Sequence, residues 1–204
     1  MSETAPLSPI AHRAALPAGS GRTIAMRNVT DRAMIDLRVR SEDAAAIEAL
    51  EAALGMALPR EPRSSTLSGD RHALWLSVDQ WLIATPLADR AGLTDSLGAA
   101  AAGGFVAVTD MSDARTIIRL EGAGARETIM KGAAADLTRS DVGTVRRMMF
   151  ADIAAMAQVI SADPDTIDVY VFRSYADYAW DWLEAASRPA ASIRLFGDQP
   201  IPAT

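Results

Sequence analysis

The sequence predicts an α+β fold in which antiparallel sheets carry helices on one face. Strand and helix patterns recur along the chain in units of two strands and one helix, which favours antiparallel pairing over a parallel sheet. Most strand candidates show the period-two alternation of half-buried strands. Half of the 204 residues are hydrophobic, which is enough for a core without disulfide bonds. Two fused split-βαβ (ferredoxin-like) units would use this number of elements.

Composition divides the chain into four segments. Residues 1–22 mix Pro, Gly, Ser and Ala without periodicity, and we expect a flexible N-terminal arm there, either disordered or ordered only on a partner. Residues 23–104 are predicted to form a first α+β unit and residues 105–190 a second. Residues 191–204 form a C-terminal tail.

The first unit is predicted to open with two strands and a helix. Alternating apolar residues predict strands at residues 23–29 and 34–40. A helix follows over residues 41–55, because Ser41 is a good N-cap and Gly55 suits the C-terminal stop. The apolar stripe of this helix consists of Ile47, Leu50 and Leu54.

A loop, two strands and a second helix complete the first unit. Clustered Pro, Ser and Gly residues predict a loop over residues 58–70. Short strands follow at residues 72–78 and 80–85, on either side of a turn. The second helix covers residues 87–102 and is predicted to end at Gly103–Gly104.

The second unit repeats the two-strand and one-helix pattern. Its strand candidates cover residues 105–110, 114–122, 144–152, 153–161 and 167–173. A short helix is predicted at residues 124–132, and Ser174 is predicted to cap an amphipathic helix over residues 174–187. In the tail, Leu195 and Phe196 are predicted to form an apolar plug.

Two groups of large apolar residues are candidates for a partner surface. In the last helix, the residues predicted to face the sheet are Tyr175, Tyr178, Ala179 and Trp182. Trp180 lies off that stripe, and an aromatic residue left over from a core often marks a protein interface. Arg173, at the preceding strand end, could pair with Asp177 or reach a partner.

Met148 and Met149 are predicted to lead a strand into the core, with a methionine-lined binding surface as the alternative.

Composition and charge exclude several classes of function. The absence of cysteine excludes disulfides, thiolate metal sites, iron–sulfur clusters and a cysteine nucleophile. Twenty basic residues against 26 acidic ones give a net charge of -6, which argues against a nucleic-acid partner. The sequence contains no apolar stretch of about 20 residues, so it predicts no membrane span. The N-terminus is interrupted by prolines and does not resemble a signal peptide. The sequence therefore predicts a cytoplasmic protein.

Motifs for catalysis and for cofactor binding are missing from the sequence. It contains neither a glycine-rich dinucleotide loop after a strand nor a Walker lysine. Of the two histidines, His12 lies in the arm, and His72 lies at a strand start, where we expect a half-exposed residue. Asp110 and Asp113 flank a turn and are predicted to bond to the backbone of that turn. We therefore expect no catalytic, cofactor-binding or metal-binding residue in this chain.

Several segments in combination resemble one known family. They are LWLSVDQWLIAT, FVAVTDMSDARTIIRLEGAGARETIMKGAAADL, GTVRRMMFADIAAMAQVI and VFRSYADYAWDWL, which cover most of residues 74–183. This combination is similar to the gamma subunit of heterotetrameric sarcosine oxidase, and the first 70 residues match that family more loosely.

The resemblance implies a role in an enzyme complex. Such a complex converts sarcosine, tetrahydrofolate and O2 to glycine, 5,10-methylenetetrahydrofolate and H2O2. The resemblance places FAD, FMN, NAD and the folate site in the two larger subunits and zinc in the smallest, and it assigns no cofactor to the gamma chain. It also implies that the gamma chain assembles with alpha, beta and delta subunits, chiefly alpha. Its fold resembles the folate-binding fold of the glycine-cleavage aminomethyltransferase.

The same resemblance bears on whether the chain could act on folate by itself. In aminomethyltransferases the strand that corresponds to IAAMAQVI carries an aspartate that works on the folate, whereas this strand has no carboxylate. Asp110 matches the family's Asp-x-Ser turn but not that position. The favoured hypothesis is therefore a non-catalytic subunit. A subunit of a related N-methylglutamate dehydrogenase, a stand-alone folate-binding one-carbon protein and an adaptor of other complexes are the alternatives.

Overall fold

The computed structural model describes residues 8–19, 21–102 and 104–191. These residues form two five-stranded sheets in which the paired strands are antiparallel. Sheet A has the strand order β1-β7-β10-β9-β8, and sheet B has the order β3-β4-β5-β2-β6. The predicted α+β class with antiparallel sheets is confirmed.

Each sheet draws on distant parts of the chain. Sheet A consists of β1 (Ala25–Val29), β7 (Arg115–Glu121), β10 (Asp165–Phe172), β9 (Ile153–Ala162) and β8 (Val145–Phe150). Sheet B consists of β3 (Ser65–Ser68), β4 (Arg71–Ser77), β5 (Gln80–Pro86), β2 (Arg32–Val39) and β6 (Val106–Asp110). The α-helices are α1 (Ala44–Leu54), α2 (Arg90–Ala100), α3 (Ala125–Met130) and α4 (Ala176–Ala186). None of the helices that the structure describes is long and apolar enough to cross a membrane.

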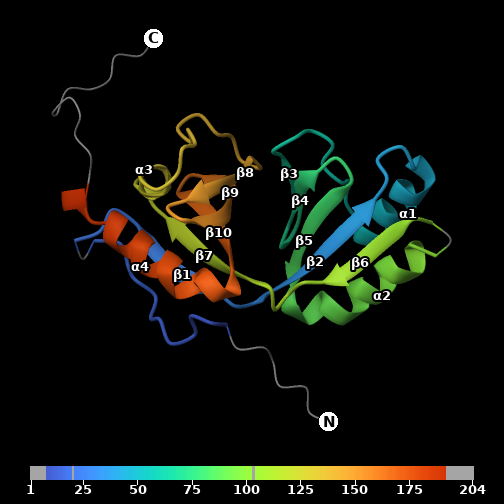
Figure 1. Ribbon diagram of the computed structural model, residues 1–204, viewed down its shortest axis with the longest axis horizontal. Helices are drawn as coiled ribbons and strands as arrows, with labels where there is room; N and C mark the ends of the chain where they lie inside the picture. Colours follow the sequence, from blue (N-terminus) through green and yellow to red (C-terminus); the bar gives the residue numbers. More distant parts are fainter. Residues whose placement is uncertain (1–7, 20, 103, 192–204) are drawn as a thin grey trace.

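The two sheets lie between two layers of helices (Figure 1). Helices α3 and α4 cover the outer face of sheet A, and α1 and α2 cover the outer face of sheet B. A third core joins the sheets through the faces that look toward each other, which we call the inner faces. This core consists of Val29, Met34, Leu74, Leu76, Leu82, Ala84, Ile117, Val145, Met156 and Tyr170. The predicted placement of helices on one face of each sheet is therefore confirmed.

Two strands cross between the halves of the chain. β1 pairs with β7 in sheet A, although its residues lie in the first predicted unit, 23–104. β6 pairs with β2 in sheet B, although its residues lie in the second predicted unit, 105–190. Sheet membership therefore differs from the predicted units at these two strands. Local patterns locate a strand in the sequence, but its partner is set by pairing between segments far apart along the chain.

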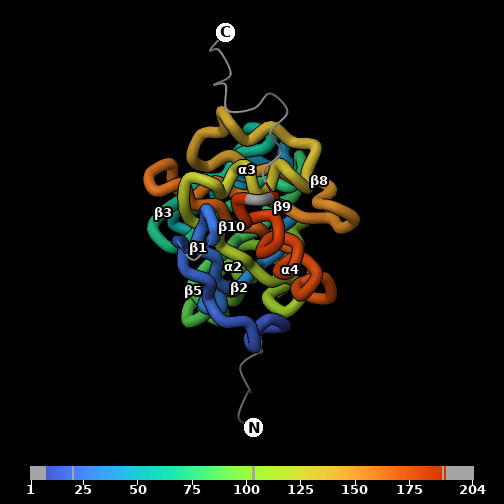
Figure 2. Tube along the Cα trace, turned by 90° about the vertical axis from the view of Figure 1, so that its left-hand side faces the viewer, coloured from blue at the N-terminus to red at the C-terminus, as the bar shows by residue number. Residues whose placement is uncertain are grey.

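Part of the segment predicted to be a flexible arm packs on sheet A. Ile10 is fully buried in the core between this sheet and α4. Leu16 forms an antiparallel bridge with Met26 of β1, and Arg13 forms an ion pair of 2.9 Å with Asp177 of α4. Figure 2 shows this N-terminal segment, in blue, beside β1. Composition does not predict this packing, because it does not reveal that Ile10 fills a core.

The helices begin at other residues than the sequence predicts. α1 has the predicted apolar stripe and ends at Gly55, whose φ of 70° lies in the left-handed region that glycine favours. Its N-cap is Asp43 instead of Ser41, because the Asp43 carboxylate accepts a hydrogen bond from a backbone N–H of the first turn. Before α4, Arg173–Tyr175 form a 3-10 turn, and Ser174 does not cap the helix.

The sequence does not predict one of the strands. β3 forms inside the segment 58–70 that is predicted as a loop, and it pairs with β4. The Ser65 hydroxyl of β3 donates a hydrogen bond of 2.8 Å to the carbonyl of Gly143, just before β8. This short polar strand lacks apolar alternation, and it is stabilised by its hairpin with β4 and by the contact with Gly143, which is distant in sequence. The predicted plug residues Leu195 and Phe196 lie outside the described residues.

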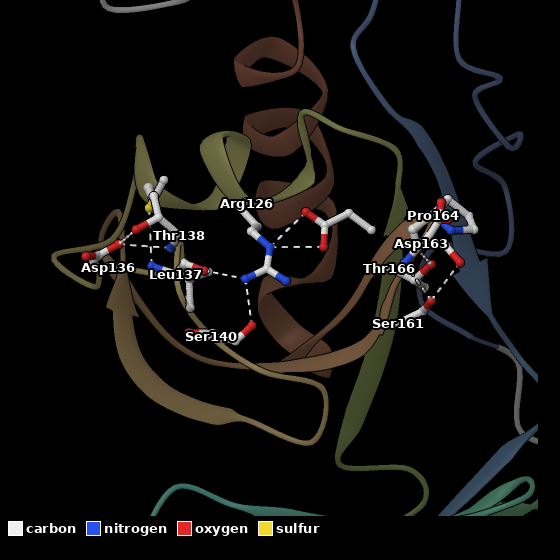
Figure 3. A network of polar contacts seen from close by, with 11 residues as sticks. Arg126, Asp136, Leu137, Thr138, Ser140, Ser161, Asp163, Pro164 and Thr166 are labelled. Atoms are coloured by element: carbon white, nitrogen blue, oxygen red, sulfur yellow. Dashed lines mark hydrogen bonds and ion pairs between the residues drawn. The ribbon is translucent and has the colours of Figure 1, made fainter. Parts of the chain in front are cut away.

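Arg126 of α3 holds the loop that follows this helix (Figure 3). Its guanidinium forms an ion pair of 2.8 Å with Asp165, at the start of β10. It also donates hydrogen bonds to the backbone carbonyls of Leu137 and Ser140, at 2.5 and 2.7 Å. This charged side chain therefore ties the loop between α3 and β8 to the start of β10.

Candidate functional site

The inner face of sheet A carries side chains in rows that run across the strands. The first row is polar and buried between the sheets. Arg119 donates two hydrogen bonds to Asp168, at 2.6 and 2.7 Å. The Tyr170 hydroxyl donates to Gln158, which in turn donates to the Ser65 hydroxyl of β3, both at 2.9 Å. Buried polar groups need such partners, and this network satisfies them within the chain.

His72 of β4 faces this polar row from sheet B. It is 5% exposed, so the prediction of a half-exposed strand residue is wrong, because sheet A covers it. Burial lowers the pKa of its imidazole, while the Asp168 carboxylate and a hydrogen bond with Gln158 act in the opposite direction. His72 is therefore neutral at pH 7 and belongs to the packing between the sheets.

The second row of the inner face is mainly apolar. Ile117, Tyr170 and Met156 lie in the core that joins the sheets. Arg147 ends this row on β8, where it pairs with Met156 and donates a hydrogen bond of 3.0 Å to the Leu76 carbonyl of β4. Sheet B therefore covers the first two rows.

The third row lies where sheet B no longer covers sheet A, and we call it the outer row. It consists of Arg115, Phe172, Ala154 and Met149. Arg115 pairs with Phe172 across β7 and β10, and Ala154 pairs with Met149 across β9 and β8. Met149 is 60% exposed and Phe172 is 37% exposed. Apolar side chains at these positions are unusual for a surface that meets only water.

The outer row borders two adjoining hollows. One, of about 910 Å³, is lined by Met149 and Phe172 together with Arg173 and Tyr175 of the turn before α4. A second, of about 980 Å³, shares Met149 and Ala154 with the first and extends along β8 toward sheet B. The two hollows make a continuous, mainly apolar surface across the ends of β8, β9 and β10.

Arg115 is a partly buried cation at one end of this surface. Its guanidinium lies 4.2 Å from the centroid of the Phe172 ring. Burial lowers the pKa of Arg115, and the charge of Arg147 lowers it further, while Asp36 of β2 opposes them. Among the residues that the structure describes, no carboxylate lies within 4.0 Å of the Arg115 guanidinium.

Arg173, which the sequence suggests as an interface residue, lies beside the outer row. Its guanidinium is 3.8 Å from the Asp113 carboxylate. It does not pair with Asp177, which binds Arg13 instead. Arg173 lines the hollow next to Phe172, and its contact with a partner stays a prediction.

Trp180, the other suggested interface residue, is 1% exposed and packs in the core between sheet A and α4. The buried stripe of α4 consists of Ala176, Ala179, Trp180, Leu183 and Ala186. Tyr175 and Tyr178, predicted to face the sheet, are exposed, and Trp182 is only partly buried. The predicted phase of this helix is therefore wrong, because small alanines continue the stripe that packs on the sheet. Burial removes Trp180 from the surface of this chain.

Of the two predicted turn carboxylates, Asp110 bonds to its own turn, whereas Asp113 lies 3.8 Å from the Arg173 guanidinium. Asp110 accepts hydrogen bonds from the backbone N–H and the hydroxyl of Ser112, at 3.0 and 2.6 Å, which confirms the predicted turn. Within the described residues, no group of three or more His, Cys, Asp or Glu side chains could hold a metal ion. On the inner face, β9 presents Ala154, Met156 and Gln158, none of which is a carboxylate.

Comparison with known proteins identifies the relatives of this chain. Residues 38–189 match the family described as "Sarcosine oxidase, gamma subunit family". The chain belongs to this family. The resemblance in the sequence motifs is thereby confirmed, and the family is one of subunits of an enzyme complex. No curated protein sequence matches the chain significantly.

Solved structures agree with the fold of this gamma-subunit family member. A chain of the heterotetrameric sarcosine oxidase from Corynebacterium sp. U-96, in complex with pyrrole 2-carboxylate, has a TM-score of 0.80 and 23% identity. The match covers 93% of this chain and 98% of that one. Aminomethyltransferase T of the glycine cleavage system from Bartonella henselae has a TM-score of 0.62 and 13% identity. That match covers 79% of this chain but only 45% of the aminomethyltransferase. The predicted likeness to the aminomethyltransferase fold is therefore confirmed.

The outer row is the feature that sequence reasoning missed in this gamma-subunit family member. The available signal was the pair Met148 and Met149, since adjacent strand residues point to opposite faces. Met148 packs against the core under the helices, as predicted for the pair, whereas Met149 lies exposed on the inner face. The alternative of a methionine-lined surface fits Met149.

Proposed function

We propose that this chain is the non-catalytic gamma subunit of a heterotetrameric, flavin-dependent sarcosine oxidase. The family match over residues 38–189 carries the proposal. The whole complex converts sarcosine, tetrahydrofolate and O2 to glycine, 5,10-methylenetetrahydrofolate and H2O2. This chain contributes no reacting group to that conversion and serves as part of the assembly.

The proposed complex places the chemistry in the other subunits. The chain packs chiefly against a large alpha subunit, with beta and delta subunits completing the tetramer. FAD, FMN, NAD, tetrahydrofolate and zinc are bound by those partners, and the complex works in the cytoplasm. The tetramer is supported by the solved enzyme with the same fold, which is a heterotetrameric sarcosine oxidase.

The inner face of sheet A supports a role without folate chemistry. Gln158 is the polar residue that β9 presents there, and its amide is already engaged by Tyr170 and Ser65. Its neighbours on the same face, Ala154 and Met156, have no group that could accept or donate a proton. β9 therefore keeps its position in the sheet, but it has no carboxylate that could act on folate.

Purification of the tagged chain from its native host tests the proposal. We expect a yellow complex with three further chains that produces peroxide from sarcosine, with N-methylglutamate as the comparison substrate. Oxidation of N-methylglutamate in preference to sarcosine would assign the chain to the related dehydrogenase. A colourless, lone protein would overturn the subunit role.

Titration of the isolated chain with tetrahydrofolate tests the non-catalytic part of the proposal. We expect no heat of binding and no shift of the melting temperature at millimolar ligand. Tight binding by the chain alone would show that the fold retains a folate site of its own.

A further inference from the structure

Exposed apolar side chains gather around the outer row of sheet A. In the described part of the chain the exposed large apolar residues are Val78, Phe105, Val142, Met149, Phe172, Tyr175 and Tyr178. Met149, Phe172 and Tyr175 line one hollow, and Tyr178 donates a hydrogen bond of 3.5 Å to Asp152 of the same hollow. A contiguous apolar patch with a polar rim is typical of a protein interface.

The charges of this patch are unbalanced at one end. The carboxylates of the first hollow already have partners, since Asp113 pairs with Arg173 and Asp152 accepts from Tyr178. Arg115 has the face of the Phe172 ring but no carboxylate at ion-pair distance among the described residues. Arg147 adds a second positive charge close by, and the Asp36 carboxylate of β2 acts on Arg115 in the opposite direction without reaching ion-pair distance. A partly buried guanidinium forms its strongest ion pair with a carboxylate on a binding partner that also excludes water from the pair.

We propose that the outer row, Arg115, Phe172, Ala154 and Met149, is the surface on which another subunit of the complex docks an apolar segment that carries a carboxylate. The apolar side chains of the segment fill the hollows beside Met149 and Phe172, and its carboxylate pairs with Arg115. This inference rests on the proposed function, because it takes the partner from the sarcosine oxidase complex.

Protection of the outer row in the intact complex is the first test. The chain has no cysteine, so a single Met149→Cys variant gives one reactive thiol on this subunit. Val78→Cys is the matched control, because Val78 is 63% exposed and Met149 is 60% exposed, and Val78 lies in the turn between β4 and β5. After maleimide treatment of the assembled complex, mass spectrometry of this chain should show at least tenfold slower labelling of Met149→Cys than of Val78→Cys.

Reversal of the Arg115 charge is the second test. We expect Arg115→Glu to weaken assembly of the complex at least tenfold, measured as the dissociation constant in a dilution series, and Arg115→Gln to have a smaller effect. Arg40→Glu is the control, because Arg40 also lies over an exposed aromatic ring, that of Phe105, at 4.8 Å on sheet B. Arg40→Glu should change the constant less than twofold.

The outcomes separate this inference from the proposed function. If the wild-type chain does not assemble with sarcosine oxidase subunits, the proposed function fails. If it assembles but the Met149→Cys and Val78→Cys thiols react equally fast in the complex, the docking surface lies elsewhere. If labelling is slow but Arg115→Glu assembles like wild type, the partner presents no carboxylate to Arg115 and the stated chemistry is wrong. Protection by a small anionic ligand without other subunits would also overturn the inference.

Discussion

Arg119 and Asp168 face each other on neighbouring strands of sheet A, and two parallel hydrogen bonds of 2.6 and 2.7 Å join them in the layer between the sheets. Asp168 is almost fully buried. These hydrogen bonds raise the pKa of Arg119 above its ordinary value. A buried charge is stabilised by its ion-pair partner. A single substitution in this pair should therefore lower the free energy of unfolding strongly.

Asp168→Asn keeps the size of the side chain and removes its charge. We expect a loss of about 3 kcal/mol in the free energy of unfolding, because Arg119 is left without a counter-charge in a buried layer. Urea unfolding at pH 7.5 measures this loss. Asp113→Asn is the control, since the pair of Asp113 with Arg173 is exposed and should contribute less than about 1 kcal/mol. Equal losses in the two variants would contradict the prediction.

The two tryptophans of α4 should differ in their contribution to stability. Trp180 is buried against sheet A, so Trp180→Ala should cost about 3–5 kcal/mol. Trp182 is partly buried and packs edge-on to Phe150, with ring centroids 4.6 Å apart, so Trp182→Ala should cost less. Thermal unfolding of both variants gives the order. A larger loss for Trp182→Ala would mean that the helix turns the other face to the sheet.

Gly132 makes room for the Trp182 ring. A Cβ atom at this position would lie 2.6 Å from the ring of Trp182 and 3.0 Å from that of Phe150. Gly132→Ala should therefore lower the free energy of unfolding by about 1–3 kcal/mol. Gly98→Ala in α2 is the control, since no atom lies within 4 Å of its added Cβ, and it should stabilise the protein by about 0.5–1 kcal/mol. Differential scanning calorimetry checks whether the two changes have opposite sign.

Burial of His72 should make stability depend on pH. Its pKa is lowered in the folded chain from the ordinary 6.5, mainly by desolvation. The unfolded chain therefore binds a proton more readily, and stability should fall as the pH drops below 6.5, by at most about 1.4 kcal/mol per pH unit for this one group. Unfolding curves between pH 5 and 8 measure the slope.

A His72→Gln variant should lose that part of the slope, and a variant of the exposed His12, His12→Gln, should keep it. The charged groups around His72 are Asp168, Arg32 and Arg119. A slope unchanged in His72→Gln would assign the pH dependence to other groups.

The sequence by itself determined the secondary structure of most segments and the family. In α1, Ile47, Leu50 and Leu54 are buried as their spacing predicts, and Gly55 ends the helix. These features have local causes, because helix periodicity and end signals act within a few residues. The family motifs are local for the same reason, and the match over residues 38–189 confirms them.

The tertiary structure alone decided which face each segment buries and which partners it meets. In α4, both the Tyr175–Tyr178 stripe and the Ala176–Trp180 stripe have helical spacing, and only packing of small alanines on sheet A selects the second. Ala25 of β1 pairs with Glu121, far along the chain, and this pairing places β1 in sheet A. The exposure of Met149 likewise depends on where sheet B stops covering sheet A. No local sequence pattern shows which side chains become buried. Burial requires a second surface that packs on the first, and a short sequence segment describes only one of the two.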